Sequence, residues 1–349
     1  MTVPSERPRR GRYVAAVAGL GLLLASCAEN APQDTLEPEG PVADRINDLF
    51  VPVFWVAVAI FVLVQGGIIY SIVRFRRRSD DEVPAQTHGN TRLEIGWTIV
   101  PAAILAVITV PTIATVLDLD DHPPDAMQVE VYGAQWWWEY EYDNGVVTAN
   151  ELHVPTGREV TLVMTSRDVI HSYWIPKLVG KKDVVPGRTH RLTFEATETG
   201  EYFGQCAEFC GASHVNMRLR VFAHEPNEFD EWLEDQADDA RQPRAGTAEA
   251  QGAELFTSRG CTSCHVIRGV NEIPRDVDRL NDLGVPWAPD LTHLASRTTF
   301  AGSLFDVNAP ELSKWLRDPP AQKDGSLMPN LNLSEDDIDA LVAYLLSLE

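Results

Sequence analysis

The chain has few cysteines and a shortage of positive charge. Only five cysteines occur in 349 residues, at positions 27, 206, 210, 261 and 264, and all of them lie in recognisable short motifs. No cysteine remains for a structural disulfide, so cysteine serves chemistry here rather than cross-linking. The 29 Lys and Arg against 51 Asp and Glu give a formal net charge of -22, which argues against a nucleic-acid partner. The length allows two or three domains.

The N-terminal segment reads as a secretory signal. Arg7 to Arg12 form a basic stretch, Tyr13 to Leu24 form a short apolar core, and the run Leu24-Ala-Ser-Cys27 resembles a bacterial lipoprotein box. We therefore predict a lipoprotein signal peptide over residues 1–26, acylation of Cys27 and a polar tether over residues 27–45. The alternative is an uncleaved first transmembrane segment, for which the apolar core is short.

Two long uncharged runs follow, Leu49 to Val73 and Ile95 to Leu117, and each is long enough to span a bilayer. Arginines begin directly after Val73, so this end is predicted to be cytoplasmic. Residues 46–118 are thus expected to form a transmembrane hairpin with both flanks outside the cell. Two buried helices of a soluble protein are the alternative.

Beyond the hairpin, from Met127 to Val221, apolar residues alternate with polar ones, and glycines interrupt the alternation at intervals. This period of two is typical of half-buried strands. We predict a β-sandwich or barrel over residues 126–223, whose loops hold functional side chains.

The densest group of candidate metal ligands is Cys206, Cys210, His214 and Met217. Thiolate, imidazole and thioether favour copper over hard cations. The cysteine spacing is too wide for a CxxC redox pair, and the ligand types are too varied for a simple zinc knuckle. Two thiolates could bridge two copper ions, with His171 as a second imidazole. A disulfide with an incidental His and Met is the alternative.

Near the C-terminus, Cys261-Thr-Ser-Cys264-His265 has the C-x-x-C-H pattern that attaches c-type haem covalently, with the histidine as proximal iron ligand. Met328 is the expected distal ligand because it is the only methionine after Met217 and its Gly-x-x-Met-Pro loop resembles that of c-type cytochromes, and His293 is the alternative. Met/His ligation suits an electron carrier.

A closing helix is expected from Ser334 to Leu348. The order of haem motif, methionine loop and closing helix resembles a small class I cytochrome c, so residues 251–349 are predicted to be an all-α domain of that type.

Together these motifs resemble cytochrome c oxidase subunit II of the haem-copper oxidase family, in the form with a fused C-terminal cytochrome c. The resemblance implies a multidomain membrane protein with a two-helix hairpin and an all-β cupredoxin domain that holds binuclear copper A. Its ligands would be His171, Cys206, Cys210, His214, Met217 and the backbone carbonyl of Glu208. The resemblance also implies a magnesium ion, bound through the Glu208 carboxylate at the interface with subunit I.

Two further roles come from the resemblance alone. Trp136 corresponds to the tryptophan through which electrons enter, although Ala134 stands where family members often have a histidine. Glu94 corresponds to a residue at the entrance of a proton channel in subunit I. The plainer interpretation of Glu94 is an acidic side chain stabilised near a helix N-terminus.

The implied function is that of a terminal oxidase subunit in a bacterial cell membrane. Electrons would pass from a donor through haem and copper to the haem-copper centre of subunit I, which reduces oxygen and pumps protons. The implied partners are subunits I and III, membrane lipid, and a cytochrome c or cytochrome bc complex as donor. The alternatives are the copper subunit of a nitric oxide reductase and a stand-alone electron-transfer lipoprotein.

Residues 224–250 are rich in Asp, Glu, Gln and Ala and are predicted to be a linker, within which Phe229 to Gln236 could form one or two helical turns against the sandwich. A flexible chain of roughly 25 residues spans on the order of 25–30 Å, which would let the haem reach Trp136. Because both domains are acidic, we expect their contact around Trp136 to be mostly apolar.

Overall fold

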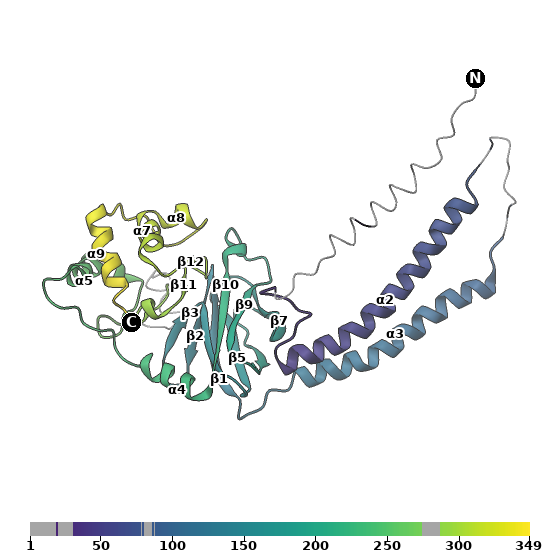
Figure 1. Cartoon of the computed structure of the whole chain (residues 1–349), viewed down its shortest axis with the longest axis horizontal. Helices are drawn as coiled ribbons and strands as arrows, with labels where there is room; N and C mark the ends of the chain where they lie inside the picture. Colours follow the sequence, from purple (N-terminus) through teal and green to yellow (C-terminus); the bar gives the residue numbers. More distant parts are fainter. Residues whose placement is uncertain (1–18, 20–30, 78, 80–85, 87, 274–286) are drawn as a thin grey trace, which may run out of the picture.

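The computed structural model describes residues 19, 31–77, 79, 86, 88–273 and 287–349. Nearly all of the predicted signal peptide, and the predicted acylation site at Cys27, lie outside these residues. A helical hairpin, a β-sandwich and a group of short helices follow one another along the longest axis (Figure 1).

The hairpin consists of α2 (Pro41–Arg74) and α3 (Thr91–Leu119), which run antiparallel (Figure 1). Both helices are long and apolar enough to cross a membrane, and none of the apolar window of either is buried within the chain. An ion pair between Arg45 and Asp118 joins the two outer ends. Exposed apolar surface of this length is stable only against lipid or other apolar helices, as the sequence predicts.

The segment before α2 is attached to the sandwich. The backbone N–H of Glu39 donates to the carbonyl of Lys177 at 2.8 Å, and their side chains form an ion pair. Gly40 approaches the carbonyl of Glu195 so closely that a Cβ atom would overlap it. Residues 37–40 of the predicted tether therefore lie against the sandwich, and the helix begins at Pro41, before residue 46.

Two five-stranded sheets form the sandwich. The first has the order β3 (Val147–Ala149), β2 (Trp137–Tyr142), β1 (Met127–Ala134), β5 (Val160–Ser166) and β8 (His190–Phe194). The second has the order β4 (Glu151–Pro155), β10 (Arg218–His224), β9 (Gly200–Cys206), β6 (His171–Ile175) and β7 (Val179–Val184). Trp138, Tyr140, Leu162 and Tyr173 are fully buried in the core. This is the all-β, cupredoxin-like domain predicted from the alternating pattern.

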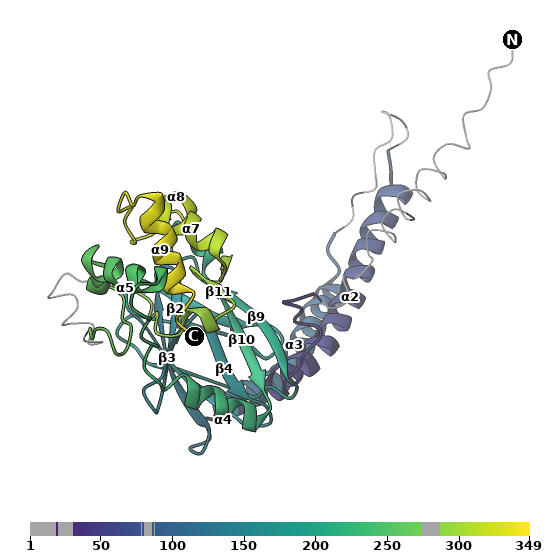
Figure 2. The ribbon, with the colours of Figure 1, turned by 60° about the vertical axis from the view of Figure 1, so that its left-hand side comes forward.

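The C-terminal domain lies on the side of the sandwich opposite the hairpin (Figures 1 and 2). Its helices are α5 (Ala248–Ser258), α7 (Ala309–Arg317), α8 (Pro319–Gln322) and α9 (Glu335–Leu345), with short turns η2 (Cys261–Ser263) and η3 (Leu294–Ser296). One small ribbon, β11 (Thr299–Phe300) with β12 (Phe305–Asp306), accompanies the helices. Phe256, Ile338, Leu341 and Tyr344 pack in its core. The prediction of a helical C-terminal domain is confirmed.

Within residues 224–250, predicted to be a linker, the short helix expected over residues 229–236 is present against the sandwich. Helix α4 (Pro226–Asp235) packs Phe229 and Trp232 against Tyr142 of the sandwich. Ala240 is buried in the core of the C-terminal domain. The physical reason is that an Asp- and Glu-rich sequence still presents one apolar helix face, and the sheet buries that face.

Candidate metal and haem centres

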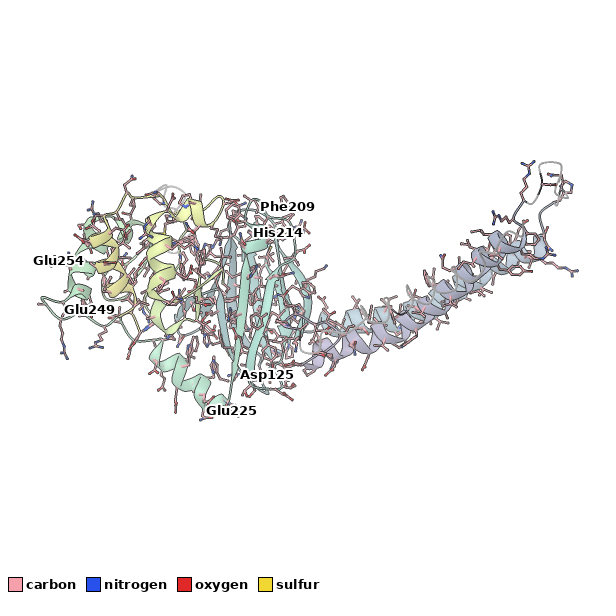
Figure 3. The ribbon with its side chains drawn as sticks, turned by 45° about the horizontal axis from the view of Figure 1, so that its top comes forward. Asp125, Phe209, His214, Glu225, Glu249 and Glu254 are labelled. Carbon is pink, nitrogen blue, oxygen red and sulfur yellow. The ribbon has the colours of Figure 1, made fainter. Side chains whose placement is uncertain are left out.

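The predicted copper ligands lie in loops at one end of the sandwich. His171 begins β6, Cys206 ends β9, His214 lies in the turn η1 (His214–Asn216), and Met217 directly precedes β10. Strands β6 and β9 are neighbours, with Tyr173 opposite Cys206, so the two loops meet. Figure 3 shows His214 and Phe209 at this end and Asp125 at the other.

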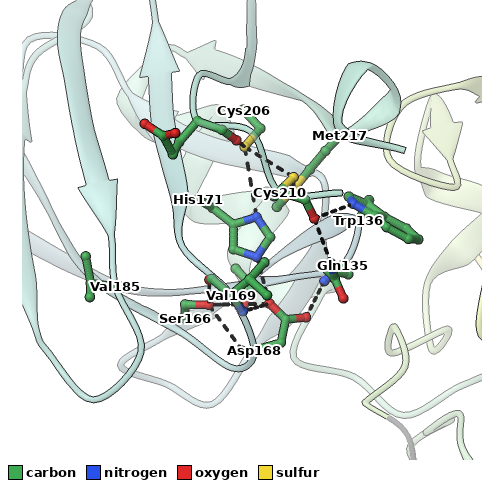
Figure 4. A network of polar contacts seen from close by, with 12 residues as sticks. Gln135, Trp136, Ser166, Asp168, Val169, His171, Val185, Cys206, Cys210 and Met217 are labelled. Carbon is green, nitrogen blue, oxygen red and sulfur yellow. Dashed lines mark hydrogen bonds and ion pairs between the residues drawn. The ribbon is translucent and has the colours of Figure 1, made fainter. Parts of the chain in front are cut away.

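His171, Cys206, Cys210 and Met217 face one another (Figure 4), and His214 lies beside Cys210. The Sγ atoms of Cys206 and Cys210 are 3.8 Å apart, and both cysteines are free. Cys206 Sγ is 3.9 Å from His171 Nδ1, whereas Cys210 Sγ is 3.6 Å from His214 Nδ1 and 3.9 Å from Met217 Sδ. A pair of sulfurs flanked by one imidazole on each side fits two bridged copper ions by its donor chemistry.

The backbone contributes a further ligand candidate. The thiol of Cys206 lies 3.2 Å from the carbonyl oxygen of Glu208, which faces the sulfur pair. The Glu208 side chain is exposed, and among the described residues it belongs to no cluster of metal-ligating side chains. The structure therefore offers no support from this chain for the magnesium ion expected there.

Asp168 orients His171, and the sequence reasoning assigned it no role. Its Oδ1 accepts a hydrogen bond from His171 Nε2 at 2.8 Å, and its Oδ2 accepts one from the backbone N–H of Gln135 at 2.6 Å. Burial lowers the pKa of His171, but the hydrogen bonds with Asp168 and Cys206 outweigh burial and raise it overall. With Nε2 donating to Asp168, Nδ1 keeps its lone pair toward the sulfurs.

The two thiols share their protons unequally. The hydrogen bond between the two thiols is the main cause that lowers the pKa of Cys206, and the same bond, with burial, raises the pKa of Cys210. Copper needs both sulfurs as thiolates, so metal binding must release the proton that the pair retains.

The haem motif opens into a cavity of about 380 Å³. Cys261, Cys264 and His265 all line it. His265 Nδ1 donates to the carbonyl of Pro289 at 2.8 Å, and burial lowers the pKa of His265. A neutral imidazole with Nδ1 occupied presents Nε2 as its ligand atom, and two free cysteines stand beside it. The residues present fit a covalently attached haem.

Met328 lines the same cavity, and the indole N–H of Trp315 donates to its Sδ at 3.1 Å. His293 does not line the cavity. Its Nδ1 and Nε2 lie 2.8 and 3.0 Å from the carbonyl oxygens of Glu349 and Asp238. Met328 therefore lies at the haem cavity, whereas His293, the alternative distal ligand, does not line it.

The sandwich supplies the remaining wall of the haem cavity. Trp136, Trp137 and Asn150 line it together with the cytochrome residues. The indole N–H of Trp136 donates to the carbonyl of Cys210 at 3.1 Å (Figure 4). One aromatic side chain therefore contacts both the haem cavity and the predicted copper loop.

One predicted site residue lies away from these centres, in the membrane hairpin. Glu94 is in the first turn of α3, whose N-cap Asn90 accepts hydrogen bonds from the N–H groups of Arg92 and Leu93.

The contact between the two domains is more polar than expected. The ammonium of Lys323 donates to the carbonyl of Trp136 at 2.6 Å, and no local sequence pattern indicated this pair.

Three family models match successive parts of the chain. They are "Cytochrome C oxidase subunit II, transmembrane domain" over residues 33–115, "Cytochrome C oxidase subunit II, periplasmic domain" over residues 145–223, and "Cytochrome c" over residues 249–349.

Full-length relatives agree with these matches. Cytochrome c oxidase subunit 2 of Alkalihalophilus pseudofirmus is 35% identical over 95% of this chain and 95% of its own length. That of Bacillus subtilis is 34% identical over 97% of this chain and 98% of its own. The crystal structure of the periplasmic domain of subunit II of cytochrome oxidase of Bradyrhizobium japonicum is 31% identical, with a TM-score of 0.32, over 33% of this chain and 95% of that one. The chain therefore belongs to the cytochrome c oxidase subunit 2 family, as a membrane-spanning subunit of a haem-copper oxidase with a C-terminal cytochrome c domain.

Proposed function

We propose that this chain passes electrons from an external donor through haem c and binuclear copper A to the haem-copper centre of subunit I. There, oxygen is reduced to water and protons are pumped. The observation that supports this route is the position of Trp136, which lines the haem cavity and donates a hydrogen bond to the carbonyl of Cys210.

The copper ligands in this proposal are His171, Cys206, Cys210, His214, Met217 and the carbonyl of Glu208. Bound there, copper supplies one-electron redox chemistry. The protein holds the ligands in place: Asp168 fixes the ring of His171, and Gln135 donates to Asp168 and to the carbonyl of Cys210. Ligands held this way need little rearrangement when the charge of the site changes.

The haem in this proposal is attached to Cys261 and Cys264, with His265 and Met328 as axial ligands. Pro289 keeps Nε2 of His265 available by accepting from Nδ1. Trp315 donates to the sulfur of Met328 and so restrains the orientation of the thioether. The largely apolar cavity excludes water from the haem, which favours a potential suited to an electron carrier.

Subunit I is the partner of the copper end of the sandwich. Phe209 and Val215, on either side of His214, are 76% and 71% exposed. Such large apolar side chains beside a redox centre favour a covered face in the assembled complex. Glu94 is proposed to serve the proton channel of subunit I, and the Glu208 carboxylate would need ligands from that subunit to bind magnesium.

The setting is the bacterial cell membrane, with the copper and haem domains on its outer side and a lipid anchor at Cys27. The further partners in this proposal are subunit III, membrane lipid, and a cytochrome c or cytochrome bc complex as donor.

The test is purification of the intact complex through a tag on this chain, followed by identification of its largest subunit and haems. A reduced soluble cytochrome c should then support oxygen consumption with four electrons taken up for each oxygen molecule. A partner with non-haem iron beside its active haem, together with turnover of nitric oxide and none of oxygen, would instead identify a nitric oxide reductase.

A further inference from the structure

A buried carboxylate joins the sandwich to the cytochrome domain. Glu151, in β4, is only 1% exposed. Its carboxylate accepts hydrogen bonds from Thr298 Oγ1 at 2.6 Å, Thr299 N at 2.8 Å and Thr299 Oγ1 at 2.9 Å, and also from Thr298 N. All four donors belong to the cytochrome domain. Since each charge-assisted bond has a preferred direction, the set specifies one relative position of the domains.

A buried ammonium joins the domains from the other side. Lys323 is 5% exposed, although lysine is rarely buried without partners. Its Nζ donates to the carbonyl of Trp136 in the sandwich at 2.6 Å and to that of Ala301 in its own domain at 2.7 Å. The charge therefore bridges the domain boundary at the residue that connects the haem cavity with the copper loop.

The backbones approach one another closely around these two contacts. Gly325 and Gly302 have φ of +78° and +81°, and an added Cβ would overlap the ring of Trp136 at the first position and the carbonyl of Asn216 at the second. The N–H of Arg218 donates to the carbonyl of Gly302 at 3.1 Å. Trp136 is consequently only 8% exposed.

An aromatic contact extends the same interface. The guanidinium of Arg167 lies 3.6 Å from the ring centroid of Tyr132 and 4.2 Å from that of Trp287. Tyr132 and Arg167 belong to the sandwich and Trp287 to the cytochrome domain, so the cation is enclosed between rings of both.

We propose that Glu151 and Lys323 form an interdomain clasp that keeps the cytochrome domain seated over Trp136, so that Trp136 receives electrons from this chain's own haem and is closed to external carriers. This inference rests on the proposed electron route. Both are positioning residues: Glu151 does not line the haem cavity, and Lys323 lines it but directs its ammonium to the carbonyls of Trp136 and Ala301. An external donor must then reduce the haem and cannot reduce the copper site directly.

The test uses the intact, metal-loaded complex in detergent. The variants are Lys323→Met, which keeps length without charge, and Thr298→Val with Thr299→Val, which removes both hydroxyl donors to Glu151. Thr298→Ser with Thr299→Ser keeps the hydroxyls and is the conservative partner. Lys314→Met is the matched control, since Lys314 lies on α7 with half of its side chain exposed.

The first readout is hydrogen exchange, which does not depend on turnover. The N–H groups of Thr298, Thr299 and Arg218 should exchange at least tenfold faster in the Lys323→Met and double-valine proteins. The double-serine and Lys314→Met proteins should match the wild type. Unchanged protection in both clasp variants would overturn the proposal, and a folding defect would appear instead as faster exchange throughout the core strands.

The second readout is transient kinetics. After flash reduction of the haem, transfer to copper should slow at least tenfold in the clasp variants, with both metal spectra unchanged. On mixing with an excess of a reduced soluble cytochrome c, the wild type should reduce its haem before its copper, and the clasp variants should lose that order. Reduction of wild-type copper before haem would overturn the proposal. If wild-type haem never reduces copper, the electron route itself is wrong, and the exchange data still decide whether the clasp exists.

Discussion

The indole N–H of Trp136 donates a hydrogen bond of 3.1 Å to the carbonyl oxygen of Cys210. Cys210 lies in the predicted copper loop, and the ring of Trp136 also lines the haem cavity. The predicted haem and copper sites, which are far apart in the sequence, are thus connected through the ring of Trp136 and one hydrogen bond.

Replacement of Trp136 tests that connection. Trp136→Ala should slow haem-to-copper transfer by about tenfold or more, because it removes both the ring and its hydrogen bond, whereas Trp136→Phe should have a smaller effect. Flash reduction of the haem in the intact complex measures the rate. Transfer should be independent of protein concentration and weakly sensitive to salt, while delivery from a basic external carrier should slow as salt rises. A rate indifferent to the Trp136→Ala change would reject this route.

The copper site should hold two metal ions per chain. Two bridging thiolates delocalise one unpaired electron, so the mixed-valence protein should be purple, with hyperfine structure from two equivalent copper nuclei in electron paramagnetic resonance. Cys206→Ser should abolish this signal, since it removes one of the two sulfurs that lie 3.8 Å apart. A single-copper spectrum from the fully loaded wild type would contradict the binuclear assignment.

The distal haem ligand is tested by a pair of substitutions. Met328→Ala should remove the sulfur ligand and lower the haem potential, and the optical spectrum should lose the features of Met/His coordination. His293→Ala should leave the haem spectrum unchanged, because His293 lies outside the cavity and contacts Glu349 and Asp238. The reverse pattern would show that the assignment of Met328 is wrong.

Asp168 should support the copper site through His171. Asp168→Asn removes the negative charge that faces His171 Nε2 at 2.8 Å and should weaken copper binding by about 10–100-fold. Competition with a chelator measures the affinity, and Asp143→Asn, at an exposed turn, is the control. Equal copper affinity in the two variants would mean that Asp168 has no role beyond local structure.

The stability of the domain should depend on pH through a histidine pair. His153 Nδ1 is 2.8 Å from His224 Nε2, and His153 stacks on Trp232 of α4. Burial, followed by the nearby charges of His224 and Arg297, lowers the pKa of His153 well below 6.5. The folded state therefore keeps this ring neutral at pH values where the unfolded chain binds a proton.

The lowered pKa of His153 in the folded state sets the direction in which stability changes with pH. The free energy of unfolding should decrease as the pH falls below about 6.5, by at most about 1.4 kcal/mol per pH unit for each such histidine. His153→Gln should flatten this dependence in thermal denaturation of the solubilised chain, while His88→Gln, at an exposed position, should not. Parallel pH profiles for His153→Gln and the wild type would exclude the histidine pair as the cause.

The sequence alone determined the family, the fold class and the ligand types. The C-x-x-C-H motif, the cysteine, histidine and methionine near position 210, and the two uncharged runs are local patterns whose spacing fits one chemistry or one bilayer. The five candidate copper ligands are identifiable from residue type and spacing, and the structure brings them together.

Only the tertiary structure decided how the two redox domains meet. Charge and composition predicted a mostly apolar contact around Trp136, whereas the structure places charged, hydrogen-bonded side chains between the domains. Glu151 meets Thr298 and Thr299, and Lys323 meets Trp136, across well over a hundred residues of chain. Each of these side chains looks like an ordinary surface residue in the sequence, because burial of a charge depends on what the rest of the chain places around it. No pattern along the chain encodes such a pair, whereas the folded surfaces of the two domains specify it.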